Sequence, residues 1–125
     1  MKKIIFPFFF LALLSCKKEE KKEPLYPETK TTSSPAELGQ EIFEGKGNCF
    51  ACHKPDQKII GPSIQEIAKT YKAKNGSIVD FLQEKSQPIV DPSQYEVMKT
   101  NFAITKSMSD EELKALEAYF YSLSK

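Results

Sequence analysis

The sequence predicts an all-α domain over residues 35–125. Strand-like alternation is weak there, and apolar residues recur at helical intervals instead. Four serines also stand three positions before an acidic residue. In this spacing, the capping box, the serine oxygen accepts from the third helical amide and the acid reaches back to the cap amide. The four pairs are Ser34 and Glu37, Ser63 and Glu66, Ser77 and Asp80, and Ser109 and Glu112.

These starts and the apolar spacing predict about four helices. The helices are expected over residues 35–46, 64–72, 78–85 and 110–123. Pro35 at the first helical position supports the first of them, since its missing amide proton costs nothing there. Pro88 and Pro92 interrupt the stretch between the third and last helices, so that stretch is predicted to be mostly loop.

Composition limits the possible functions. The chain has 125 residues, with 18 basic residues, all of them Lys, against 17 acidic ones, and a formal net charge of +1. This balance gives no reason to expect nucleic-acid binding, and the length excludes a multidomain enzyme. Residues 35–125 carry 11 Lys and 13 acidic residues, a net charge of −2, with no basic patch. A monomer is the default expectation for a domain of this size.

The N-terminus is typical of an export signal. Lys2 and Lys3 precede an apolar run over residues 4–14, which is shorter than the ~20 residues that a membrane-spanning helix needs. The run ends in Leu-Leu-Ser-Cys at Cys16, which resembles the lipobox of bacterial lipoproteins. The resemblance implies a signal peptide over residues 1–15, cleaved before a lipid-modified Cys16. The alternative is an ordinary signal peptide with an incidental cysteine.

Residues 16–34 are expected to tether the folded domain to the membrane. After Cys16 they contain a run of Lys and Glu, then Pro24, Pro27 and a Thr/Ser run, and such a composition cannot bury apolar area. We therefore predict a disordered tether that keeps the domain near the membrane. The Lys and Glu run also resembles surface-export signals of some Bacteroidetes lipoproteins, although a generic solvated linker is the simpler explanation.

The chemistry of the chain is concentrated in Cys49-Phe50-Ala51-Cys52-His53. This C-x-x-C-H spacing is the attachment motif for a c-type haem. The two thiols can form thioethers with the two vinyl groups of one porphyrin, which places His53, the only histidine of the chain, against the iron. We therefore expect the helices to surround one covalently bound haem. A redox-active dithiol usually lies in a βαβ setting, and a zinc site needs two more soft ligands, so both alternatives are disfavoured.

A second protein ligand for such an iron is often a methionine. Beyond the signal peptide, the chain offers Met98 and Met108. Met108 immediately precedes the cap Ser109 and is placed to form a hydrophobic staple with Leu113, so it already has a structural role. Met98 lies in the Pro-bounded stretch and has no such role. Met98 is therefore the predicted distal ligand, with Met108 as its competitor.

Together these residues resemble a small bacterial class I c-type cytochrome, close to the cytochrome c-551 type. The resemblance covers residues 35–125 and includes Met98 by its order along the chain. Besides Cys49, Cys52 and His53, the matching residues are Gly39, Phe43, Gly61, Pro62, Leu116 and Tyr119 or Phe120. The resemblance implies that Gly39 lets the last helix cross closely. It also implies that the Pro62 carbonyl accepts a hydrogen bond from His53, which orients the imidazole.

The resemblance further implies haem iron ligated by His53 and Met98, with no vacant site for a substrate. The expected function is electron transfer rather than catalysis. We expect a membrane-tethered one-electron carrier between a membrane-associated donor and a terminal oxidase or reductase, with small and transient docking contacts. The expected location is the cell envelope, lipid-anchored to a bacterial membrane and facing the periplasm, with the outer surface as the alternative.

Two other classes of function stay open at this point. A haem-based ligand sensor or a peroxidase-like enzyme would need an open distal site. A thiol–disulfide protein would keep free thiols at Cys49 and Cys52 and carry no covalent haem.

Overall fold

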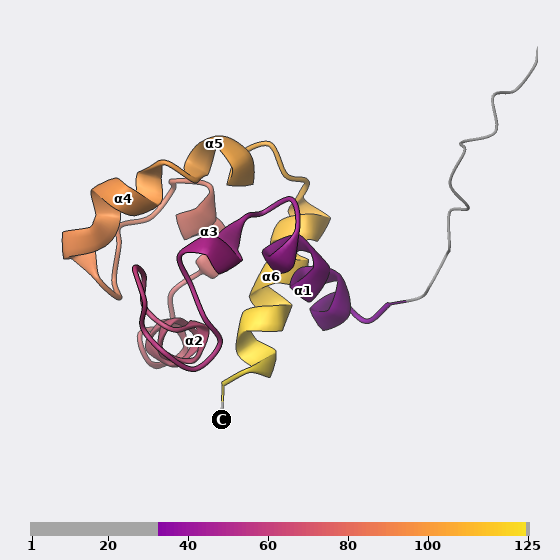
Figure 1. Cartoon of the computed structure of the whole chain (residues 1–125), viewed down its shortest axis with the longest axis horizontal. Coiled ribbons are helices and arrows are strands. Elements are labelled where there is room, and N and C mark those ends of the chain that lie inside the picture. Colours follow the sequence, from indigo (N-terminus) through magenta and orange to yellow (C-terminus); the bar gives the residue numbers. More distant parts are fainter. Residues whose placement is uncertain (1–32, 125) are drawn as a thin grey trace, which may run out of the picture. The chain divides into compact units, whose positions relative to one another are not determined.

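In the computed structural model, residues 33–124 form six α-helices and two short 3₁₀ helices, with no β-strand in this part of the chain (Figure 1). The α-helices are α1 (Pro35–Glu44), α2 (Ile64–Ala73), α3 (Ile78–Leu82), α4 (Tyr95–Lys99), α5 (Phe102–Thr105) and α6 (Asp110–Ser122). The 3₁₀ helices are η1 (Cys49–Ala51) and η2 (Pro92–Gln94). The predicted all-α class is confirmed. The predicted signal peptide, Cys16 and most of the predicted tether lie outside the described residues.

The four predicted serine caps start α1, α2, α3 and α6. In each, the serine Oγ accepts a hydrogen bond from the backbone amide three residues further on. Two of the four pairs also close the reciprocal bond: Glu37 accepts from the Ser34 amide at 2.7 Å, and Glu112 accepts from the Ser109 amide at 3.0 Å. α3 ends before residue 85, its predicted end, because Glu84 takes up a left-handed conformation with a φ of 59°.

The stretch between α3 and α6, residues 83–109, is mostly loop as predicted, but 12 of its 27 residues are helical, which the prediction did not include. It contains η2, α4 and α5. Pro92 is the first residue of η2, a position where a helix loses nothing from the missing amide proton. These three helices have no side-chain cap, so the capping pattern did not mark them. Tyr95 in α4 packs instead against the rings of Phe81 and Phe102, with centroids 6.3 and 6.0 Å away.

α1 and α6 form the most extensive helix–helix contact and cross closely (Figure 1). Gly39 lies at the crossing, where an added Cβ would overlap the Ala115 carbonyl and come within 2.7 Å of the Tyr119 Cβ. The expected role of Gly39 is thereby confirmed. One turn further along α1, the Phe43 ring packs on those of Tyr119 and Phe120, at centroid distances of 5.4 and 6.1 Å.

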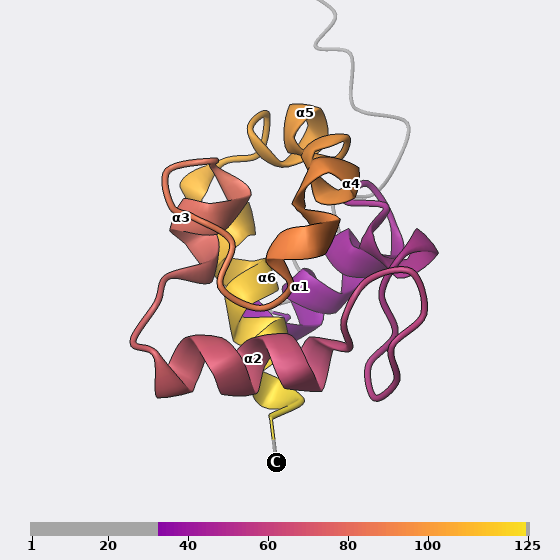
Figure 2. The ribbon, with the colours of Figure 1, turned by 90° about the vertical axis from the view of Figure 1, so that its left-hand side faces the viewer.

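The hydrophobic core lies between α6 and the helices α2 and α3, which both contact α6. Ile64, Leu113 and Leu116 are fully buried there. Met108 is buried in the same cluster as Leu113, as expected for a hydrophobic staple. Figure 2 shows α2 running across α6, with α5 at the other end of the domain. Within residues 33–124, no helix has both the length and the apolar character needed to cross a membrane.

Candidate haem-binding site

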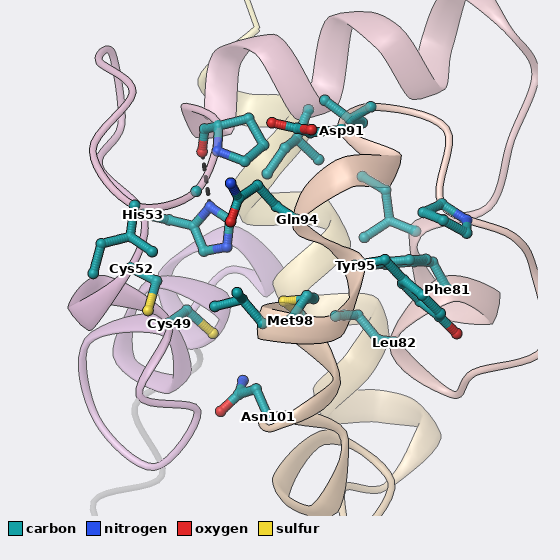
Figure 3. A pocket seen from close by; sticks show the side chains of 18 of the residues that line it. Cys49, Cys52, His53, Phe81, Leu82, Asp91, Gln94, Tyr95, Met98 and Asn101 are labelled. Atoms are coloured by element: carbon teal, nitrogen blue, oxygen red, sulfur yellow. Dashed lines mark hydrogen bonds between the residues drawn. The ribbon is translucent and has the colours of Figure 1, made fainter.

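A pocket opens between the C-x-x-C-H motif, α2, α3 and the segment that leads into α4 (Figure 3). It holds about 1080 Å³ of space between the atoms, a volume that includes open solvent at its mouth. Most of its wall is apolar. Cys49, Cys52, His53, Pro62 and Met98 all line it. The fold thus brings the predicted site residues of the domain together from segments that are far apart in the sequence.

The two cysteines reach the pocket because η1 coils the motif into a single turn. The turn starts after Asn48, which has a left-handed φ of 51°. The amides of Cys52 and His53 both donate to the Cys49 carbonyl, at 3.1 and 3.0 Å. Cys49 is buried and Cys52 is half-buried. Both sulfur atoms and the His53 ring therefore lie on the same side of the pocket, as Figure 3 shows.

His53 is held by the turn that ends the loop after the motif. Its Nδ1 donates a hydrogen bond to the Pro62 carbonyl oxygen at 2.7 Å, which is the bond that the resemblance implied. Because a carbonyl can only accept, Nδ1 carries the proton and Nε2 keeps a free lone pair. Gly61 packs against the ring, where an added Cβ would come within 2.8 Å of Nδ1. The Gly61 amide donates to the Cys52 carbonyl at 2.8 Å, which ties this turn to the motif.

Burial shifts the pKa values of two of these residues. It lowers the pKa of His53 below its ordinary value, and the hydrogen bond to Pro62 only partly opposes this shift. The imidazole is therefore neutral near pH 7, the form that ligates metals. Burial also raises the pKa of the Cys49 thiol to about 11. Such a thiol stays protonated and is a poor redox nucleophile, which disfavours the thiol–disulfide alternative.

The structure separates the two candidate methionines. Met98, in α4, lines the pocket together with His53 (Figure 3). Met108 precedes α6, is buried in the hydrophobic core and is not among the residues that line the pocket. Met98 is therefore the methionine that stands within the site.

Two polar contacts that the sequence did not indicate connect the two sides of the pocket. Lys58, in the loop after the motif, places Nζ 2.9 Å from Oδ2 of Asp91, just before η2. Asn101, after α4, donates from Nδ2 to the Gly47 carbonyl, just before the motif, at 3.1 Å. The partners are 33 and 54 residues apart in the two contacts. No local pattern of charge or spacing signals pairs of such wide separation.

These residues fit a covalently attached haem. Two thiols lie on the same side of the pocket as a neutral imidazole with a free Nε2, and α4 adds a thioether. Within residues 33–124, no group of three or more His, Cys, Asp or Glu side chains could hold a bare metal ion. A porphyrin supplies the equatorial ligands of its own iron, so one imidazole and one thioether complete the coordination. The apolar wall suits the macrocycle.

A helical domain with a C-x-x-C-H turn, a half-buried neutral histidine and an apolar pocket defines a c-type haem protein. Comparison with known families agrees, since the model of the family described as cytochrome c matches residues 36–124. The chain therefore belongs to the cytochrome c family, whose members carry covalently attached haem c. Haem c is accordingly the cofactor of this chain.

Shorter matches point to individual cytochromes. The chain is 47% identical over 45 residues to cytochrome c2 of Rubrivivax gelatinosus, a match that covers 36% of this chain and 47% of that protein. It is 41% identical over 49 residues to cytochrome c-551 of Azotobacter vinelandii, a match that covers 39% of this chain and 57% of that protein. It is 38% identical over 40 residues to cytochrome c-551 of Pseudomonas denitrificans, a match that covers 32% of this chain and 48% of that protein. The chain thus spans about half the length of the curated relatives it matches.

Proposed function

We propose that the chain is a monohaem c-type cytochrome that carries single electrons and has no catalytic activity of its own. In this proposal Cys49 and Cys52 hold the haem through thioethers, and His53 and Met98 are the two protein ligands of its iron. The haem supplies the one-electron couple of that iron. The observation that carries the proposal is the convergence of these four side chains on one pocket.

The surrounding residues keep the proposed iron ligand His53 in place. The Pro62 carbonyl fixes the tautomer and the ring orientation of His53, and it makes the imidazole a better electron donor. Gly61 packs against one side of the ring and so limits its rotation. The Met98 thioether is a soft ligand, which raises the reduction potential. With both positions taken by protein groups, no position is open for a substrate.

A redox partner is proposed to dock on an apolar rim at the pocket mouth. We define the apolar rim as Phe50, Ile59, Ile60 and Val97, which are 41–54% exposed. Ile60 and Val97 also line the pocket. Lys58 and Lys99 nearby are each paired with a carboxylate of this chain, so they offer little free charge to a partner. Four side chains bury too little area for a permanent complex, which fits a transient encounter.

The membrane attachment is also part of the proposal. Cys16 would carry the lipid anchor, and residues 17–34 would keep the domain close to a membrane-associated donor and a terminal oxidase or reductase on the periplasmic side. Such a tether raises the local concentration of the carrier. We expect Cys16→Ser to move the protein from the membrane fraction to the soluble fraction, and a variant that stays with the membrane would contradict the anchor.

Optical spectra of the haem-loaded protein, oxidised and reduced, test the iron ligands. We expect a low-spin wild type whose oxidised form shows the weak red band of a methionine–iron bond. Met98→Ala should abolish that band. Met108→Leu, the matched change in the core, should keep it, because this methionine does not line the pocket.

Each of the other possible outcomes would support one of the competing hypotheses. A band that survives Met98→Ala but is lost in Met108→Leu would make Met108 the ligand. A high-spin wild type that binds carbon monoxide readily would support a ligand sensor or a peroxidase-like enzyme. Titratable thiols at Cys49 and Cys52, without covalent haem, would support a thiol–disulfide protein.

A further inference from the structure

We propose that the ion pair between Lys58 and Asp91 positions the distal ligand. In this inference the pair holds residues 91–101, here called the Met98 segment, against the motif side of the pocket. The pair thereby sets how readily Met98 is displaced from the iron. The inference rests on the proposed ligation of the iron by Met98.

The Met98 segment has little burial of its own to hold it in place. η2 and α4 contain no buried residue. α4 is only 5 residues long and has no side-chain cap, and Val97 within it is 48% exposed. Short and exposed helices of this kind open at a low free-energy cost. Tyr95, packed on Phe81 and Phe102, and the partly buried Met98 supply apolar contacts, and polar contacts add to this attachment.

Those polar contacts stand at the two ends of the Met98 segment. At its start, Asp91 accepts from Lys58 Nζ at 2.9 Å through Oδ2 and from Ser93 Oγ at 2.5 Å through Oδ1. The hydrogen bond from Ser93 fixes the Asp91 carboxylate to the turn that starts the Met98 segment. The attraction of Lys58 therefore acts on the whole Met98 segment. At its end, Asn101 donates to the Gly47 carbonyl. Met98 lies between these two attachments.

Lys58 belongs to a loop that is itself firmly attached to the motif. The loop, residues 54–60, begins directly after His53 and ends directly before Gly61. The Gly61 amide donates to the Cys52 carbonyl at 2.8 Å, and the Ile64 amide donates to the Lys54 carbonyl at 3.0 Å. The ion pair therefore links the loop that supports His53 to the segment that carries Met98. Since the Asp91 side chain is 20% exposed and that of Lys58 57%, the pair contributes modestly, as partly exposed pairs do.

Competition between Met98 and added imidazole, in the oxidised haem-loaded protein, measures this role. Loss of the red band reports displacement of the methionine. We expect Asp91→Asn and Lys58→Gln each to raise the apparent imidazole affinity about two- to fivefold. The double variant should raise it no further than either single one, since one interaction is lost in all three. Salt at about 0.5 M should raise the affinity of the wild type toward that of the variants, because it screens the pair.

Two comparisons separate positioning from a simple charge effect. Lys58→Gln removes a positive charge and Asp91→Asn a negative one, so they move the reduction potential of the iron in opposite directions. Loss of the attachment raises the imidazole affinity in both. Glu96→Gln is the matched control, because its pair with Lys99, 3.1 Å long, lies within α4 and does not cross the pocket. This variant should bind imidazole as the wild type does.

Equal imidazole affinities in Asp91→Asn, Glu96→Gln and the wild type would overturn the inference. Opposite shifts in Lys58→Gln and Asp91→Asn would also overturn it, because they would indicate a charge effect alone. A wild type without the red band would contradict the Met98 ligation itself, and with it the proposed function. The red band and the melting temperature of each variant, measured without imidazole, check that the domain is intact.

Discussion

At the scale of single residues, Gly61 shows how the backbone positions the proposed iron ligand. The chain has no glycine with a positive φ within residues 33–124, so Gly61 is needed for space and not for an unusual backbone conformation. Its Cα lies against the His53 ring, where a side chain would not fit. This close approach lets the next residue, Pro62, present its carbonyl to Nδ1 of His53.

We predict that Gly61→Ala displaces the imidazole from Pro62. The added methyl group would overlap the His53 ring, and such overpacking costs about 1–3 kcal/mol. Urea unfolding should show this loss of stability, and the absorption spectrum of the haem should change with it. Gly45→Ala is the control, since its Cβ would meet only the Glu41 carbonyl of α1, at 2.8 Å, and should leave the spectrum as it is. A wild-type spectrum and stability in Gly61→Ala would contradict the argument.

At the scale of elements, Glu112 connects the start of α6 to the end of α1. Its carboxylate accepts from the Ser109 amide at 3.0 Å and pairs with Lys46, which follows α1. The hydrogen bond from Lys46 is the largest cause that lowers the pKa of Glu112 below its ordinary value of 4.5, and the Ser109 amide is the next. A carboxyl whose pKa is lowered in the folded state stabilises that state above the unfolded pKa. It loses this contribution as the pH falls through the folded pKa.

We expect Glu112→Gln to be less stable than the wild type by about 0.5–1 kcal/mol near pH 7, after allowance for solvent screening. The difference should shrink as the pH falls from the ordinary pKa of 4.5 through the lower pKa of the folded state, because the wild-type carboxyl becomes protonated over this range. Urea unfolding of the two proteins at pH 7 and near pH 3.5 measures it. Glu111→Gln makes the same charge change in the same turn and should show a smaller difference. An equal difference in stability between Glu112→Gln and the wild type at both pH values would contradict this role of the Glu112 carboxylate.

At the scale of the whole molecule, ion pairs neutralise part of the surface charge, and the exposed apolar side chains lie at the pocket and beside it. The described residues form ion pairs between Lys46 and Glu112, Lys58 and Asp91, Lys99 and Glu96, and Lys106 and Glu84. The large apolar side chains that are exposed within residues 33–124 are those of the apolar rim. Contact with a partner through this rim should therefore depend little on electrostatic steering.

Electron exchange between two copies of the haem-loaded protein tests the rim without a natural partner. We expect the exchange rate to change less than about twofold as the salt concentration rises tenfold. Ile60→Glu should slow the exchange at low salt and make it salt-dependent, because it places like charges at the contact. Gln40→Glu adds the same charge on α1, away from the pocket, and should behave as the wild type. A steep salt dependence in the wild type would count against an apolar contact.

Much of this fold is predictable because its signals act over one or two helical turns. The serine caps place the starts of α1, α2, α3 and α6 at the expected residues, from Pro35 to Asp110. The haem motif is equally local, since Cys49, Cys52 and His53 fall within one turn. The spacing of residues along the chain is therefore sufficient to predict the all-α class, the haem cofactor and the preference for Met98 over Met108.

Other features were decided only when distant segments met. α4 and α5 form without caps and depend on rings brought together by the fold, such as Tyr95 against Phe81. The Lys58–Asp91 pair joins residues 33 positions apart. The free energy of such contacts depends on which segments pack together, and no local pattern records it. The sequence by itself therefore determined the helix starts and the haem chemistry, while the tertiary structure decided how the Met98 segment is held over the pocket.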